Sequence, residues 1–206
     1  MKKLLFTAAV AVLGLSNVNA QEEAKTFGFG EGDIFIEGMV NFSSTNDKNS
    51  DEKTNGFGIS PKAGYFLNDD LAVGAMLSYD SNKTEVSGTD ISKYNTFGAG
   101  VFARYYVLDL GERFKTYSEF GIGYATSNDK IADLKENTIG AGLDLGINYF
   151  VTEKIALSFG LKNILSFSSS KYDVSGAKAV TDFNLGFGDV ANPFGGNVNF
   201  GLLYKI

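Results

Sequence analysis

Apolar side chains recur at every second position over most of the chain beyond residue 32. This is the period of a half-buried β-strand, in which successive side chains point to opposite faces, and it differs from the 3.6-residue period of a helix. The alternation marks eight runs, at about 33–43, 56–67, 71–79, 97–107, 114–125, 137–150, 155–161 and 198–206. The chain is therefore expected to form an all-β fold.

The lengths of the runs and of their connections indicate a membrane barrel. Most runs have 9 to 14 residues, whereas strands of soluble proteins have about 5–6 and a tilted strand crosses a bilayer with about 9–11. The connections alternate between long polar segments, 44–55, 80–94, 126–136 and 166–196, and short ones, 68–70, 108–113 and 151–154. We expect an eight-stranded antiparallel up-and-down transmembrane β-barrel with short periplasmic turns and long extracellular loops.

Two segments depart from this simple pattern. Phe183, Leu185 and Phe187 alternate inside the last long connection, but a ninth barrel strand would put the C-terminus on the wrong side of the membrane. These residues are therefore expected to extend a hairpin above the membrane. Pro61 lies within the second run, and because proline cannot donate a ladder hydrogen bond, a bulge or local break is expected there.

The face opposite the apolar residues indicates a narrow interior. Thirteen glycines of the marked runs lie on that face, and Gly38 is the exception. Glycine weakens a strand and covers no surface, so a solvated face would favour other residues. In an eight-stranded barrel, however, the interior is only just wide enough for side chains. Large residues share this interior face with the glycines, namely Phe35, Met39, Phe66, Phe102, Tyr106 and Tyr117.

Ionisable residues on the same face form the candidate site. They are Glu37, Lys62, Arg104, Lys115, Glu119, Asp144 and Lys162. Four cations and three anions nearly neutralise one another, which favours a structural ion-pair network that fills the lumen. Two alternatives stay open. The charges could line a narrow channel, or the face could be the solvated surface of a secreted lipocalin-like binder.

Aromatic residues on the apolar face fall near the two ends of the runs. One girdle is expected near the long loops, at Phe42, Phe57, Tyr79, Phe97 and Tyr124. The other is expected near the short turns, at Tyr65, Tyr105, Phe114, Tyr149 and Tyr204. Aliphatic residues occupy the middle, as in barrels whose amphipathic rings lie at the two membrane interfaces.

The N-terminus has the pattern of an export signal. Lys2 and Lys3 precede an apolar run over 4–15, and Val18 and Ala20 are small residues at positions −3 and −1 of a cleavage site. The run is too short to span a bilayer as a helix. We expect a signal peptide at 1–20, an N-terminal periplasmic extension at 21–32 and the barrel domain at 33–206.

Composition excludes most familiar catalytic and metal chemistry. The chain has no His and no Cys, which removes the commonest general base, metal ligand and thiol nucleophile. The interior carboxylates have as many cations beside them, so ion pairing explains them better than catalysis. A partial calcium-loop pattern at Asp47, Asn49 and Asp51 lacks its glycine and glutamate positions. We expect no enzyme, no cofactor, no metal and, at a net charge of −6, no nucleic-acid partner.

The chain resembles the small eight-stranded outer-membrane barrels of Gram-negative bacteria, the OmpA-transmembrane-domain and OmpX-like group. The most specific element is the last run, where Phe200, Leu202, Tyr204 and Ile206 alternate. It is similar to the terminal signal that the barrel-assembly machinery reads in that group, although Ile206 stands where a terminal Phe is favoured. The resemblance implies an outer-membrane location and a monomer held in outer-membrane lipid.

These observations together favour an integral outer-membrane barrel with a largely sealed polar lumen. Its expected role is structural or surface interaction through the extracellular loops, where an unidentified ligand could bind. Each long loop carries three acidic residues and two lysines, so no basic patch points to a polyanion. The alternatives are a narrow porin or small-amphiphile conduit and, third, the secreted lipocalin-like binder.

Overall fold

The computed structural model describes residues 27–186 and 198–206; the expected signal peptide at 1–20 lies outside them. The described chain forms strands and turns. The strands are β1 (Ile34–Asp47), β2 (Glu52–Phe66), β3 (Leu71–Val86), β4 (Thr89–Asp109), β5 (Phe114–Asp129), β6 (Leu134–Phe150), β7 (Ile155–Tyr172), β8 (Val180–Leu185) and β9 (Val198–Lys205). No helix in this part of the chain is long and apolar enough to cross a membrane.

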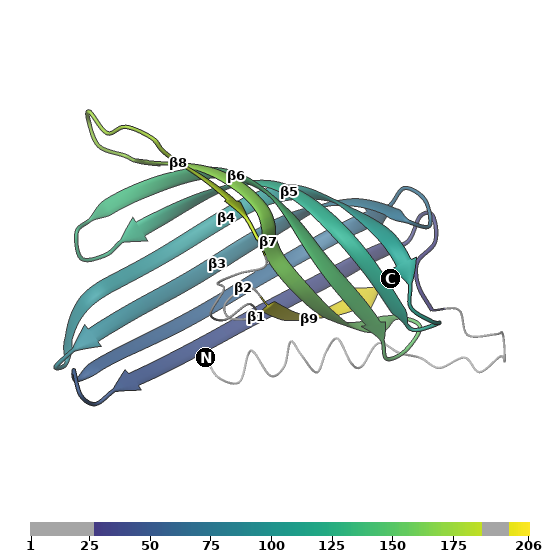
Figure 1. The fold of residues 1–206 in the computed structure, drawn as a ribbon, viewed down its shortest axis with the longest axis horizontal. Helices are drawn as coiled ribbons and strands as arrows, with labels where there is room; N and C mark the ends of the chain where they lie inside the picture. Colours follow the sequence, from purple (N-terminus) through teal and green to yellow (C-terminus); the bar gives the residue numbers. More distant parts are fainter. Residues whose placement is uncertain (1–26, 187–197) are drawn as a thin grey trace.

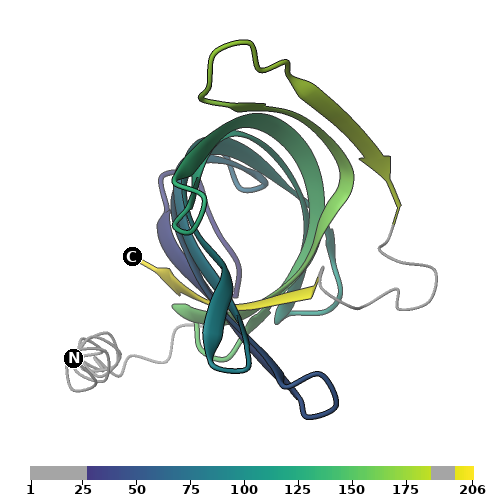
Figure 2. The ribbon, with the colours of Figure 1, turned by 90° about the vertical axis from the view of Figure 1, so that its left-hand side faces the viewer.

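Eight of these strands close a barrel in which every neighbouring pair is antiparallel. The order runs from β1 to β7 along the chain, and β9 then closes the ring by pairing with both β7 and β1. Figure 2, seen from the long-hairpin end, shows the closed ring and the short β9 that completes it. The predicted eight-stranded up-and-down barrel is thereby confirmed.

Strand β8 lies outside the ring. It pairs with β7 over Leu165–Ser170 only, and Figures 1 and 2 show it projecting beside the barrel wall. The predicted hairpin extension is therefore present, built from residues 180–185. The part of segment 166–196 beyond residue 186 lies outside the described residues.

The strands extend into the long connections, so the long extracellular loops are largely paired hairpins and the strands are longer than the alternating runs. Hairpin β1–β2 turns only between Asp47 and Glu52, and β3–β4 turns between Val86 and Thr89. Paired polar side chains hold the hairpins together, for example Thr54 with Thr84 at 3.1 Å. In these hairpins both faces of each strand carry polar residues. The alternation of apolar and polar residues that marks a strand in the sequence is therefore missing there.

The pairing is irregular at several points, and two of them bear on the sequence prediction and on the lumen. The β2–β3 ladder is broken at Ser60 and Pro61 while the register stays the same on both sides, which is the local break expected from proline. Between β6 and β7 the register shifts from Leu143↔Leu165 to Leu145↔Leu161. The β7 strand therefore bulges opposite Asp144.

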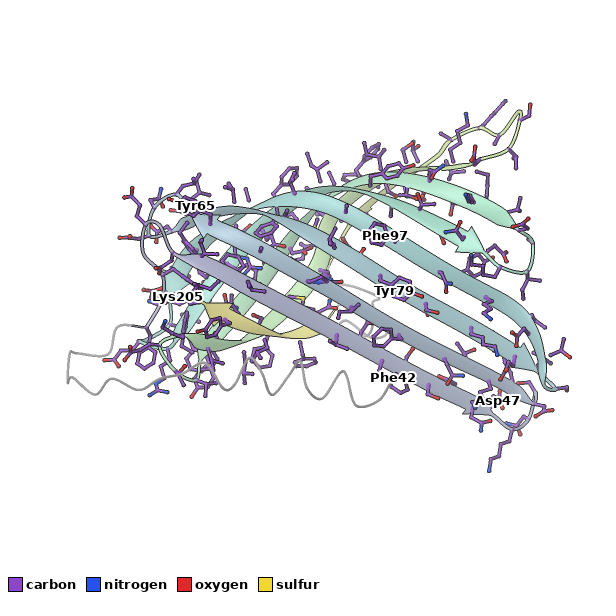
Figure 3. The ribbon with its side chains drawn as sticks, turned by 180° about the vertical axis from the view of Figure 1, so that it is seen from behind. Phe42, Asp47, Tyr65, Tyr79, Phe97 and Lys205 are labelled. Carbon is purple, nitrogen blue, oxygen red and sulfur yellow. The ribbon has the colours of Figure 1, made fainter. Side chains whose placement is uncertain are left out.

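The outer face of the barrel is an apolar band with aromatic rings toward both ends. Val101 in the middle of β4 is 60% exposed. Figure 3 shows Tyr65 at the short-turn end, near Lys205, and Phe42, Tyr79 and Phe97 toward the long hairpins, whose tip carries Asp47. The register pairs aromatic rings across strands in both rows, Phe42 with Phe57, Tyr79 with Phe97, and Phe114 with Tyr149. An apolar surface of this extent requires lipid around it.

Candidate functional site in the barrel lumen

Bulky aromatic side chains fill the short-turn half of the lumen. The buried cluster contains Phe35, Phe66, Phe102, Tyr106, Tyr117 and Phe150 together with Ala72, Ala156 and Leu203. Interior glycines make room for these rings: a Cβ at Gly64 would overlap the Phe35 ring, and one at Gly146 would overlap Tyr117. The glycine-rich face of the sequence is thus explained here by side-chain crowding.

The N-terminal segment folds into this end of the barrel. Phe29 stacks on Phe66 with ring centroids 4.3 Å apart and meets Phe150 edge-on at 5.2 Å. Phe27 also contacts Phe150 and lies under the guanidinium of Arg113, 4.4 Å from the ring centroid. The described part of the expected 21–32 extension is therefore a plug of the barrel mouth.

Backbone contacts fix the N-terminal plug, residues 27–33, in place. Lys205 Nζ donates to the Gly28 carbonyl at 2.8 Å, and the Gly32 N–H donates to the Phe66 carbonyl at 3.0 Å. Sequence reasoning missed this segment because it contains no strand alternation long enough to recognise. The available signal was the alternation of Phe27 and Phe29 with glycines directly ahead of the first run.

Four of the seven predicted ionisable residues meet in one cluster above the aromatic layer. Arg104 Nη2 lies 2.6 Å from Glu37 Oε2 and 2.6 Å from Glu119 Oε2. Arg104 Nε also donates to Glu119 Oε2 at 2.8 Å. Lys62 pairs with the other oxygen of Glu119. The four side chains come from β1, β2, β4 and β5, so the cluster bridges the lumen.

The cluster is neutral and almost completely withdrawn from water. Arg104 and Glu37 are 0% exposed, and Glu119 and Lys62 are 3% and 6% exposed. The Arg104 guanidinium also lies 4.0 Å from the ring centroid of Tyr117. Two cations facing two carboxylates meet the condition under which buried charges are tolerated. We call these four residues the ion cluster.

A polar chain beside the ion cluster was not foreseen. The Tyr106 hydroxyl donates to Asn148 Oδ1 at 2.7 Å, and Asn148 Nδ2 donates to the Ser158 hydroxyl at 2.7 Å. Asn148 is 0% exposed and Ser158 is 1% exposed. The alternation in the sixth and seventh runs places both on the interior face, and this signal could have identified them.

The other three predicted residues form no ion pair with the ion cluster. Lys115 pairs with Asp109 at 2.5 Å near the short-turn rim, where that carboxylate is exposed. Asp144 accepts the backbone N–H of Asn163 at 2.8 Å. Lys162 forms no ion pair within the described residues. The predicted seven-member network is therefore divided in the structure. Lys115 lies near the short-turn rim, whereas Asp144 is the register partner of Glu119 and Lys162 stands in the β7 bulge opposite Asp144, both beside the ion cluster without an ion pair to it.

The half of the lumen toward the long hairpins is hollow. One cavity of about 340 Å³ is lined by Ser60, Lys62, Met76, Ser78, Gly98, Gly123, Thr138, Gly140, Asp144, Lys162, Asn163 and flanking positions. A second of about 330 Å³ extends to Glu119, Gly121, Gly142, Ser166 and Ser168. The ion cluster thus forms the floor of a polar space.

The lumen chemistry is that of pairing and hydrogen bonding. Both carboxylates of the ion cluster face cations within ion-pair distance. Within the described residues no group of three His, Cys, Asp or Glu side chains could hold a metal ion. The arrangement can close the barrel in one half and present polar groups in the other.

Comparisons with known proteins agree with this geometry. The family model described as "Outer membrane protein beta-barrel domain" matches residues 8–190. The crystal structure of the outer membrane protein OprG from Pseudomonas aeruginosa is similar at 15% identity, covering 87% of this chain and 98% of that chain with a TM-score of 0.53. The NMR structure of E. coli outer membrane protein W has 19% identity, coverage of 86% and 99%, and a TM-score of 0.46. No curated protein sequence matches the chain.

Proposed function

Since this chain belongs to the family of outer membrane protein β-barrel domains and lies in the outer membrane, we propose that it is a sealed barrel with a structural or surface-interaction role. The hairpins on the extracellular side would carry any interaction, and the barrel would hold them rigidly. A secreted lipocalin-like binder would expose the apolar band to water. In an outer-membrane protein the band is covered by lipid, so family membership counts against that alternative.

The observation that carries the proposal is the closure of the lumen by two successive layers. The ion cluster crosses the interior with Arg104 and Glu37 fully buried. Directly toward the short turns lies the aromatic cluster, into which Phe29 is inserted. A water-filled pore would hydrate these charges, so their burial supports a lumen that conducts no ions.

The absence of catalysis is part of the proposal. The chain has neither His nor Cys, and Glu37 and Glu119 face cations within ion-pair distance. A carboxylate that faces a cation in this way is a poor general base, because the neighbouring positive charge stabilises its ionised form. The ion cluster is better explained as a structural closure.

The hairpins offer the surface for partners. Continued pairing of β1–β2, β3–β4 and β5–β6 beyond the apolar band makes them stiff, so the tips stand away from the membrane (Figure 1). The alternating outer face of β9, with Phe200 62% exposed, would serve recognition by the barrel-assembly machinery. The protein would act as a monomer, with the hairpins binding an extracellular ligand.

Single-channel recording of the purified protein in a planar bilayer tests the sealed lumen. We expect no steady conductance from the unaltered protein. Arg104→Ala should raise the frequency of open events, because it removes the cation that joins Glu37 to Glu119. A reproducible open level in the unaltered protein would overturn the proposal and favour the narrow-porin alternative.

A further inference from the structure

The cavities above the ion cluster form one continuous space. The cavity of about 340 Å³ and the cavity of about 330 Å³ share Met76, Gly123, Gly140, Asp144 and Asn163 in their walls. Their combined size lies within the range of small-molecule sites, which are roughly 300–1,000 Å³. The ion cluster blocks the periplasmic side, so this space is a blind vestibule open to the long hairpins.

Two glycines of the vestibule wall, Gly140 and Gly142, border open space, whereas Gly98 makes room for the Ser78 hydroxyl. A Cβ at Gly140 would have its nearest atom, the Phe167 carbonyl oxygen, at 3.4 Å, and one at Gly142 would meet Asn163 Oδ1 at 3.3 Å. Larger residues would therefore fit with small shifts, unlike at Gly64, where the Phe35 ring occupies the space. Glycine in a strand is unfavourable by itself, so its use here preserves open volume.

The β7 bulge directs polar side chains into this volume. Three residues, 162–164, stand opposite the single Asp144 between the pairs Leu143↔Leu165 and Leu145↔Leu161. Asn163 takes a left-handed conformation with φ 57° and is held by its N–H bond to Asp144. Bulges commonly re-aim side chains beside sites. Lys162 and Asn163 both line the larger cavity as a result.

Lys162 is the cation of the vestibule that is left without a partner. Lys62 is taken by Glu119, and Asp144 accepts a backbone N–H. Among residues 27–186 and 198–206, Lys162 makes neither a hydrogen bond nor an ion pair. Asp144, Glu119 and Asp80 act on its charge from beyond ion-pair distance, and Asp80 lines neither cavity. One ammonium group therefore faces the vestibule with its hydrogen-bonding capacity unused.

We propose that the vestibule binds a small hydroxylated carboxylate, of the size of a sugar acid, from the extracellular side. Its carboxylate pairs with Lys162 Nζ, and its hydroxyls bond to Asn163 and to the wall hydroxyls of Ser60, Ser78 and Ser166. Asp144 offsets part of the charge of Lys162, so the site suits a ligand with one carboxylate and several hydroxyls better than a doubly charged phosphate. Binding here goes beyond the proposed sealed-barrel role, because it needs neither conduction nor the hairpin tips.

Methyl NMR of the detergent-solubilised protein, labelled with ¹³C-methyl methionine, tests the site. The Met76 methyl lies against Gly100 and Gly121 inside the vestibule. Met39 is 4% exposed and lines neither cavity, so it is an internal control. Met39→Leu and Met76→Leu assign the signals.

The probe is D-glucuronate, titrated to about 100 mM, where a Kd of about 1 mM would be saturated. D-Glucose and D-glucosamine are the neutral and cationic comparisons.

We expect D-glucuronate to shift the Met76 signal saturably while the Met39 signal stays in place. Lys162→Gln should weaken binding by roughly tenfold or more, and Lys171→Gln, on the exposed part of the same strand, should leave it unchanged. Gly140→Leu should abolish binding with Lys162 intact, and heat-shifted gel mobility would show that the barrel has formed.

Three results would overturn the assignment. An unmoved Met76 signal excludes the vestibule as the site. An equal response to D-glucose excludes carboxylate recognition, and an unchanged affinity in Lys162→Gln excludes that lysine as the anchor. These outcomes are independent of the conductance experiment, so failure of the vestibule site and failure of the sealed lumen can be told apart.

Discussion

At the scale of single residues, Arg104 is the side chain on which the closed half of the lumen depends most. Arg104→Ala would leave Glu37 and the Oε2 oxygen of Glu119 facing each other without their shared cation. Breaking a buried ion pair on one side costs about 3–5 kcal/mol. Urea unfolding from lipid vesicles should therefore show a loss of this size.

The matched control for Arg104 is Lys115→Ala. That lysine also forms an ion pair, but its partner Asp109 has a side chain that is 62% exposed. The Lys115 side chain is 14% exposed but its partner is open to water, so the loss should be about 1 kcal/mol, well below that of Arg104→Ala. Equal losses in the two variants would contradict the assigned role of burial.

Two interior glycines should respond in opposite ways to the same added methyl group. Gly64→Ala would push a Cβ into the Phe35 ring, and overpacking of this kind costs about 1–3 kcal/mol. Gly140→Ala enters the vestibule with its nearest contact at 3.4 Å, and should be neutral or stabilising by up to about 1 kcal/mol. Urea unfolding of both variants measures the difference. Equal effects would contradict the division of the lumen into filled and hollow halves.

At the scale of elements, weakening the N-terminal plug should lower the stability of the barrel without opening its lumen. Phe29→Ala would lose the stacking on Phe66 and the edge contact with Phe150. Because Phe29 is half-buried, the loss in urea unfolding should be about 1 kcal/mol, roughly half of what full burial of a phenylalanine contributes. Glu31→Ala, which changes an exposed side chain of the same segment, is the control. The bilayer should stay non-conducting, because the ion cluster remains; a new open level would mean that the plug alone closes the lumen.

The tip of hairpin β5–β6 should loosen in acid. The backbone N–H groups of Ala132 and Ile131 donate to Asp129, which lowers the pKa of that carboxyl below its ordinary value of 3.8. The stabilisation is therefore complete above the unfolded pKa and is lost as the pH falls through the folded pKa. Amide exchange at Ile131 and Ala132, normalised for its intrinsic pH dependence, should accelerate below about pH 4. Asp129→Asn should remove this pH dependence.

At this scale the sequence predicts those elements whose signal lies within a run of neighbouring residues. Alternation is local, so strands with one apolar face were found, whereas the polar hairpin extensions were not. The pairing of Arg104 with Glu37 joins β4 to β1 across the lumen, and it depends on the stagger of all strands between them. The bulge at residues 162–164 and the plug at residues 27–33 are short segments without alternation, so neither gives a periodic pattern.

At the scale of the whole molecule, the barrel combines a closed half with a hollow one. The aromatic cluster and the ion cluster join distant strands through the lumen, so they stiffen the ring from inside. The half toward the hairpins keeps its glycines and hydroxyls around empty volume. The shape of the ring in that half must then come mainly from its backbone ladders, which continue far beyond the apolar band.

The apolar band itself predicts how the whole barrel responds to a charge on its lipid side. Val101 is 60% exposed on the outer face of β4, and its register partners Ala75 and Ile122 are apolar as well. Val101→Arg would place a cation in the hydrocarbon region, at a cost of about 2–4 kcal/mol near the midplane. Val101→Leu keeps the surface apolar and should change stability little. Urea unfolding from vesicles compares the two, and an arginine variant as stable as the leucine variant would mean that water rather than lipid covers this face.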